Sequence, residues 1–174
     1  MSWRAVFADQ ARTCAELGSP FTAAILTIIA ENGLPDGPIA DRISSWSGDI
    51  SSRGASVPLR LMGALHALVL LNKDPQLVAQ YPPNPIDIAA LSQAIDAALT
   101  RHVGHIDTWL NSAPQTNEVG RSAALITAAN WLAQHHTLPI TLSELGASAG
   151  LNLLFDHYAV QAGPVTLGAT APVL

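Results

Sequence analysis

Helix start signals recur so closely along the first 137 residues that they leave little room for strands. Ser2 and Ser19-Pro20 each place a capping residue directly before an apolar stretch, in the second case with proline at the first helical position. Glycine follows each stretch, at Gly18 and Gly33, where helices commonly end. These signals predict helices at residues 2–17, 19–33, 37–46, 57–72, 74–80, 86–110 and 117–136, and a loop at 49–56.

The pattern changes after Pro139. Ile140–Leu145 has the composition of a short strand, and Leu151–Tyr158 that of a helix or a turn. Two further short strands, at 159–161 and 164–167, are predicted to form a hairpin. The sequence therefore predicts strand structure only near its C-terminal end.

This division predicts a helical domain at residues 1–137 and a second segment at 138–174 that opens with a strand. A lone strand leaves its backbone groups unpaired, and a parallel sheet needs further strands after crossovers. We therefore expect the chain to be the first part of a longer protein. The alternative is a self-contained helical domain with a small β-hairpin.

Composition limits the classes of partner. The net charge is −5 and no run of Lys or Arg occurs, which argues against nucleic acid. The longest apolar runs, 21–30 and 61–71, are shorter than the roughly 20 residues of a membrane span. Charged residues make up only 12% of the chain, so we expect an apolar helical face that supports a homo-oligomer. The single cysteine, Cys14, favours a reducing cytoplasm.

The stretch Thr141–Leu154 contains two overlapping motifs. Residues 146–150 form a G-x-S-x-G, the elbow that presents a nucleophilic serine in hydrolases. However, the only acid and base that follow Ser148 are the adjacent Asp156 and His157, and no H-G-G-G oxyanion loop precedes it. A serine hydrolase is therefore the weaker interpretation.

The second motif is an acidic residue followed by spaced glycines. Glu144, Gly146 and Gly150 approach the loop by which Rossmann-like methyltransferases hold S-adenosylmethionine, with Ser148 in place of the middle glycine. Missing side chains let a ligand approach the backbone, and the carboxylate can take the ammonium of the cofactor. The acid that would hold the ribose is not visible, because residues 164–174 contain no Asp or Glu. A tight turn that binds nothing is the third interpretation.

Three stretches together resemble the bacterial domain-of-unknown-function family 2332. They are Arg60–His66, Gln115–Arg121 and Glu144–Leu153, in this order, and the resemblance covers nearly the whole chain. It implies that the chain continues past Leu174 into a Rossmann-like, methyltransferase-like α/β domain, of which residues 138–174 are the first β-turn-α unit. It implies no activity.

Together these observations predict a small-molecule enzyme that uses S-adenosylmethionine. Glu144, Gly146, Ser148, Gly150 and Asn152 are predicted to bind the cofactor, Arg60, His66 and Asn117 the substrate, and Glu118 and Arg121 to be catalytic, with Glu118 as the base.

Each of these predictions has an ordinary structural alternative. Glu118 and Arg121 can form a surface ion pair across one helical turn, and Asn117 can be a helix cap. Arg60 and His66 are about 240° apart around a helix and do not share a face. A non-catalytic binding or assembly module is therefore the second functional hypothesis.

We predict no metal site. His102 and His105 are three residues apart and His135 and His136 are adjacent, but no carboxylate or third ligand stands at a defined spacing from either pair. The tryptophans on helical faces are expected to pack in the fold.

Overall fold

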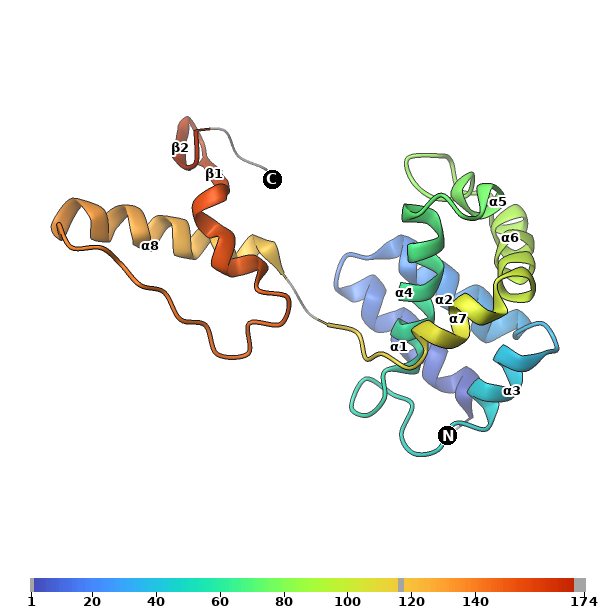
Figure 1. Ribbon diagram of the computed structural model, residues 1–174. Coiled ribbons are helices and arrows are strands. Elements are labelled where there is room, and N and C mark those ends of the chain that lie inside the picture. Colours follow the sequence, from blue (N-terminus) through green and yellow to red (C-terminus); the bar gives the residue numbers. More distant parts are fainter. Residues whose placement is uncertain (1, 116–117, 171–174) are drawn as a thin grey trace. The chain divides into compact units, whose positions relative to one another are not determined.

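The computed structural model describes residues 2–115 and 118–170. The chain divides into two compact units, Met1–Pro114 and Gln115–Leu174 (Figure 1). This division lies before the last long helix, whereas the sequence places the boundary at residue 137. Within the described residues, no helix combines the length and the apolar character that crossing a membrane requires.

The first unit is helical. It contains α1 (Trp3–Glu16), α2 (Pro20–Asn32), α3 (Pro38–Ser44), α4 (Val57–Leu70), α5 (Pro75–Val78), α6 (Ile88–Arg101) and α7 (Val103–Trp109). α1 packs along α2, and α4 contacts α1, α5 and α7. α6 contacts α2, α5 and α7, which closes the unit around α4.

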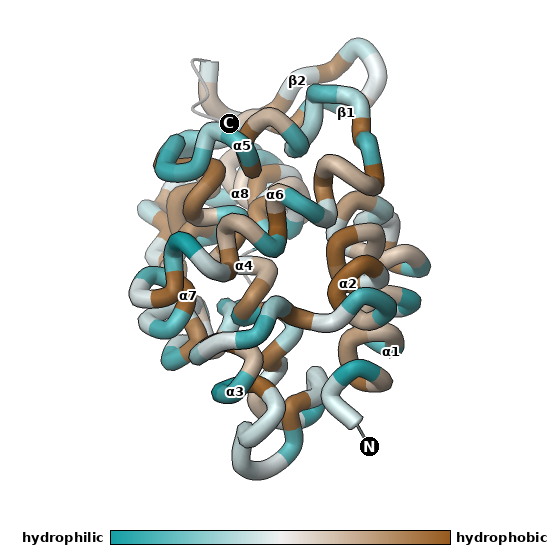
Figure 2. Tube along the Cα trace, turned by 90° about the vertical axis from the view of Figure 1, so that its right-hand side faces the viewer, coloured by the Kyte–Doolittle hydropathy of each residue, from teal (hydrophilic) through white to brown (hydrophobic). Residues whose placement is uncertain are grey.

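The core of this unit follows the apolar spacing of α2 and α4. Leu61, Leu65 and Leu68 of α4 and Leu26 of α2 are fully buried, and Ile29 of α2 is almost fully buried. Positions three or four residues apart lie on one face of a helix, so these side chains form continuous stripes. Figure 2 shows the strongly hydrophobic character of α2. The unpaired Cys14 of α1 is buried in the same core.

Helices begin at Ser2 and Asp74 with side-chain caps, whereas Ser19, also a predicted cap, makes no side-chain capping bond. The Ser2 side chain accepts a hydrogen bond from the backbone N–H of Ala5, and Asp74 accepts one from Leu77 at the start of α5. Pro20 and Pro38 occupy the first turns of α2 and α3. The predicted loop at 49–56 is also confirmed.

One helix prediction is corrected. The sequence predicts a single helix over 86–110, but the structure divides it into α6 and α7 at His102, whose backbone is not helical. His102 contacts the buried carboxylate of Asp74, and after the break α7 packs against α4 and α3. Tertiary packing therefore overrides a helical pattern that is continuous in the sequence.

The second unit is smaller and more open. It contains two 3₁₀ helices, η1 (Val119–Arg121) and η2 (Leu151–His157), the helix α8 (Ser122–His135), and the strands β1 (Ala159–Ala162) and β2 (Val165–Gly168). The strands pair antiparallel, with Ala159 opposite Gly168, as the hairpin prediction requires. α8 packs against η2 and both strands.

The strand predicted at Ile140–Leu145 is not formed. This segment has no strand pairing, and the one sheet among the described residues is the β1–β2 hairpin. A strand requires a hydrogen-bonding neighbour, and the described residues supply none to this segment. The structure thus confirms a mainly helical chain with a small antiparallel hairpin, and a Rossmann-like unit is not confirmed.

Candidate functional site

The loop that contains Glu144 has an unusual backbone. Gly146, Ser148 and Gly150 have φ values of 70°, 56° and 73°, so every second residue is in the left-handed region. Glycine adopts this conformation without strain, whereas serine does so at a cost. A Cβ atom placed on Gly146 would meet no atom within 4 Å, so the space beside this backbone is open.

The C-terminal end of the loop is attached to the rest of the second unit. Asn152 Oδ1 accepts a hydrogen bond from the hydroxyl of buried Ser122 on α8, at 3.0 Å. The Tyr158 hydroxyl donates to the carbonyl of Leu151 at 2.9 Å. These bonds fix the chain just after Gly150. In contrast, the side chain of Leu145 is completely exposed.

The polar side chains of the loop lie at the surface and do not form a catalytic triad. Glu144 is exposed, and the Ser148 hydroxyl donates a hydrogen bond to Gln115 Oε1 at 3.2 Å. Asp156 and His157, the only acid and base that the hydrolase interpretation offers, are 3.9 Å apart and both exposed. The contact of Ser148 with Gln115 is not the serine–histidine contact of a catalytic triad.

The predicted catalytic pair forms an ion pair on the surface. Arg121 Nε donates to Glu118 Oε2 at 2.9 Å, and the two side chains are 68% and 62% exposed. Asn117, the predicted substrate-binding neighbour, lies outside the described residues. The geometry matches the ordinary alternative of an exposed pair across one turn, whose contribution to stability is small.

The two predicted substrate residues on α4 lie in different surroundings. Arg60 donates from Nη1 to the carbonyl of Leu110 at 3.0 Å and from Nε to the carbonyl of Ala55, and its guanidinium lies over the ring of Trp46. His66 instead stacks on Tyr81, with ring centroids 5.9 Å apart. As the helical spacing indicates, α4 does not bring Arg60 and His66 together. Arg60 is occupied in holding the 49–56 loop and the end of α7.

The structure also contains a buried polar cluster that sequence reasoning missed. Asp74 is fully buried, and its Oδ2 lies 2.8 Å from Arg101 Nη1 and 2.9 Å from His102 Nε2. Burial alone raises the pKa of Asp74, but the Leu77 N–H, His102 and Arg101 together hold it below its ordinary value. The sequence predicts a helix that begins at Asp74, but no local pattern links this residue to Arg101 and His102, which follow 27 and 28 positions later.

The comparisons with known proteins place the chain in a family. A family model described as "Uncharacterized protein conserved in bacteria (DUF2332)" matches residues 4–174. The chain belongs to this family. No curated protein and no solved structure matches the chain significantly. Membership in the DUF2332 family confirms the resemblance carried by the three sequence motifs.

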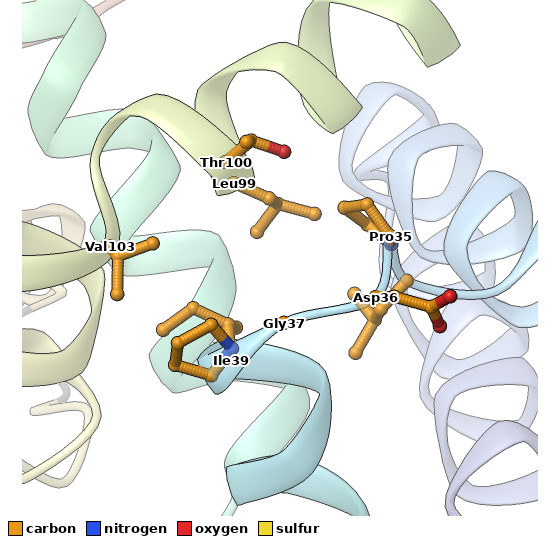
Figure 3. Close-up of a pocket in the computed structure, with 9 residues that line it drawn as sticks. Pro35, Asp36, Gly37, Ile39, Leu99, Thr100 and Val103 are labelled. Atoms are coloured by element: carbon orange, nitrogen blue, oxygen red, sulfur yellow. The ribbon is translucent and has the colours of Figure 1, made fainter.

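The DUF2332 chain has a small cavity in its first unit that is too small for a ligand. Figure 3 shows Leu99, Thr100 and Val103 facing the 34–39 segment across this cavity, whose volume is about 100 Å³. Ligand pockets commonly measure about 300–1,000 Å³. Over residues 2–115 and 118–170, no three His, Cys, Asp or Glu side chains gather closely enough to hold a metal ion. The expectation of no metal remains a prediction.

Proposed function

We propose that this DUF2332 protein is an S-adenosylmethionine-dependent methyltransferase that acts on a small molecule. The loop from Glu144 to Gly150 carries the proposal. It combines an exposed carboxylate with a backbone that is left-handed at three alternate residues and open beside Gly146. A carboxylate can bind the ammonium group of such a cofactor, and an open glycine backbone lets the rest of the molecule approach closely.

The residues of the loop have distinct roles in this proposal. Glu144 binds the ammonium group of the cofactor. Gly146 and Gly150 let the cofactor approach the backbone, and Ser148 contributes a hydroxyl contact. Asn152 holds the end of the loop in place through its hydrogen bond with Ser122. The cofactor supplies the methyl group, and the chain aligns it with the acceptor.

In the same proposal, Glu118 and Arg121 face the methyl acceptor, which is the small molecule that receives the methyl group. Methyl transfer requires the acceptor to lose a proton when its new bond to carbon forms, and Glu118 is the base that takes this proton. Arg121, which is paired with Glu118, orients the carboxylate. A cytoplasmic location belongs to the proposal, because the single thiol is buried and unpaired.

Calorimetric titration of S-adenosylmethionine and S-adenosylhomocysteine into the chain tests the proposal. We expect micromolar binding that is lost on Glu144→Ala, because the carboxylate supplies the charge that holds the ammonium group. Glu16→Ala removes an exposed carboxylate from α1 and is the matched control, which should bind as the wild type does. Equal binding by both variants, or no binding by the wild type, contradicts the proposal.

A specific observation favours a second function, that of a non-catalytic binding or assembly module. One face of α8 is mostly apolar, and Trp131 on this face is 57% exposed. The face consists of Ala123, Ala124, Thr127, Ala128, Trp131 and Leu132. An exposed apolar helix face is typical of an assembly surface, including one between copies of the same chain. Absence of cofactor binding in the titration would favour this module.

A further inference from the structure

An open groove of the first unit lies between α2 and α4. It measures about 540 Å³, within the usual range of small-molecule sites. Phe21 and Ile25 line it from α2, and Met62 and His66 line it from α4. The groove belongs wholly to residues of the first unit and is separate from the Glu144 loop of the second.

Aromatic rings form one wall of the groove. Phe21 meets the edge of Tyr81 with centroids 4.7 Å apart and planes at 72°. His66 stacks on Tyr81 with planes at 27°. Because each ring is held by the next, the wall presents fixed flat faces on which a planar ligand can stack at small entropic cost.

Three polar groups along the groove remain available. Among the described residues, the hydroxyls of Thr22 and Tyr81 and the imidazole of His66 make no hydrogen bond. No polar side-chain atom of the described residues is both sealed from solvent and unpaired, so the Tyr81 hydroxyl reaches solvent. The Tyr81 phenol is a neutral hydrogen-bond donor near neutral pH, and burial raises its pKa further, to about 12.

The groove lacks permanently charged side chains. Its lining contains no Lys, Arg, Asp or Glu, so an ionic ligand would lose its hydration without gaining an opposite charge. The groove does offer apolar side chains, flat rings and neutral donors. We propose that it binds a small uncharged aromatic molecule that stacks beside His66 and accepts a hydrogen bond from Tyr81. This inference does not depend on the proposed methyl transfer.

Prodan, an uncharged planar naphthalene ketone whose fluorescence reports its surroundings, is the probe for the test. We expect the full chain to bind prodan saturably, with a blue-shifted emission. His66→Ala should weaken prodan binding about five-fold, because it removes the ring on which prodan stacks. His66 is exposed, so the substitution leaves the core of the first unit unchanged. Tyr81→Phe keeps the ring and should also weaken binding about five-fold through the lost hydrogen bond to the ketone.

His135→Ala is the matched control. His135 is likewise an exposed histidine that stacks on an aromatic ring, that of Trp131 on α8, at 4.2 Å. This variant should bind prodan as the wild type does. Weaker binding by His135→Ala with unchanged binding by His66→Ala would place the dye on the α8 face and overturn the proposal.

A chemical readout on the unmutated chain completes the test. Diethyl pyrocarbonate modifies exposed imidazoles, and mass spectrometry gives the extent of modification at each histidine. Saturating prodan should slow modification of His66 several-fold and leave that of His135 unchanged. Equal protection of both histidines, no protection of His66, or no saturable binding would each overturn the proposal.

Discussion

At the scale of single residues, Asp74 should control the acid stability of the first unit. Its folded pKa lies below its ordinary value of 3.8, so folding stabilises the charged form. This contribution to the free energy of unfolding is fully present above pH 3.8 and is lost as the pH falls through the lower folded pKa. We therefore expect denaturant unfolding to show stability that declines as the pH falls below about 4.

Asp74→Asn should flatten this decline. It should also lower the free energy of unfolding at neutral pH by roughly 2 kcal/mol, because Arg101 and His102 lose their charged partner. Asp9→Asn is the control. Its ion pair with Arg12 is exposed on both sides, so its effect should stay below about 0.5 kcal/mol. Parallel pH profiles for Asp74→Asn and the wild type would contradict this role.

Single residues also show which parts of the candidate site were accessible to sequence reasoning. The Glu118–Arg121 pair and the different helix faces of Arg60 and His66 follow from helical spacing, and the structure shows both. The left-handed conformation of Ser148 and the Asn152–Ser122 hydrogen bond could not be predicted. They depend on contacts between residues distant in the sequence, which no local pattern records.

At the scale of the helices, the residues that precede α6 and α2 differ in whether their side chains cap the helix. Asp87 accepts hydrogen bonds from the N–H groups of Ala89 and Ala90 at the start of α6, at 2.9 and 3.1 Å. Ser19 occupies the same position on α2 but makes no side-chain capping bond. Asp87→Ala should therefore lower the free energy of unfolding by about 1 kcal/mol, and Ser19→Ala by much less. Equal losses in chemical denaturation would show that the side-chain bond of Asp87 contributes nothing.

The same scale explains why most helices could be predicted and two segments could not. α1 and α2 have start and stop signals within a few residues of their ends, so sequence alone locates them. The break at His102 depends on the buried carboxylate of Asp74, which comes from another helix start. The 140–145 segment has strand composition, but composition does not supply the neighbouring strand that a sheet needs.

At the scale of the whole molecule, the two units differ greatly in buried apolar surface. The core of the first unit includes many fully buried side chains, whereas the residues of the second unit that are buried among those described are Ser122, Ile126 and Tyr158. Local stability follows buried contacts, so the second unit should open more readily.

Hydrogen exchange followed by mass spectrometry measures this difference. Peptides from α8 should exchange their amide hydrogens at least about ten-fold faster than peptides from α4, since opening α8 exposes less apolar surface. The two helices have the same length, 14 residues, which makes them a fair pair. Similar protection of both would contradict this difference in stability.

The burial of Cys14 gives the molecule a native reporter of its own opening. Its thiol accepts a hydrogen bond from Gln10 and is enclosed by the core between α1 and α2. A thiol reagent can reach the sulfur only when this part of the first unit separates. Because the sequence contains no second cysteine, the rate at which a colorimetric thiol reagent reacts with the protein reports how often α1 and α2 separate, without any engineered label.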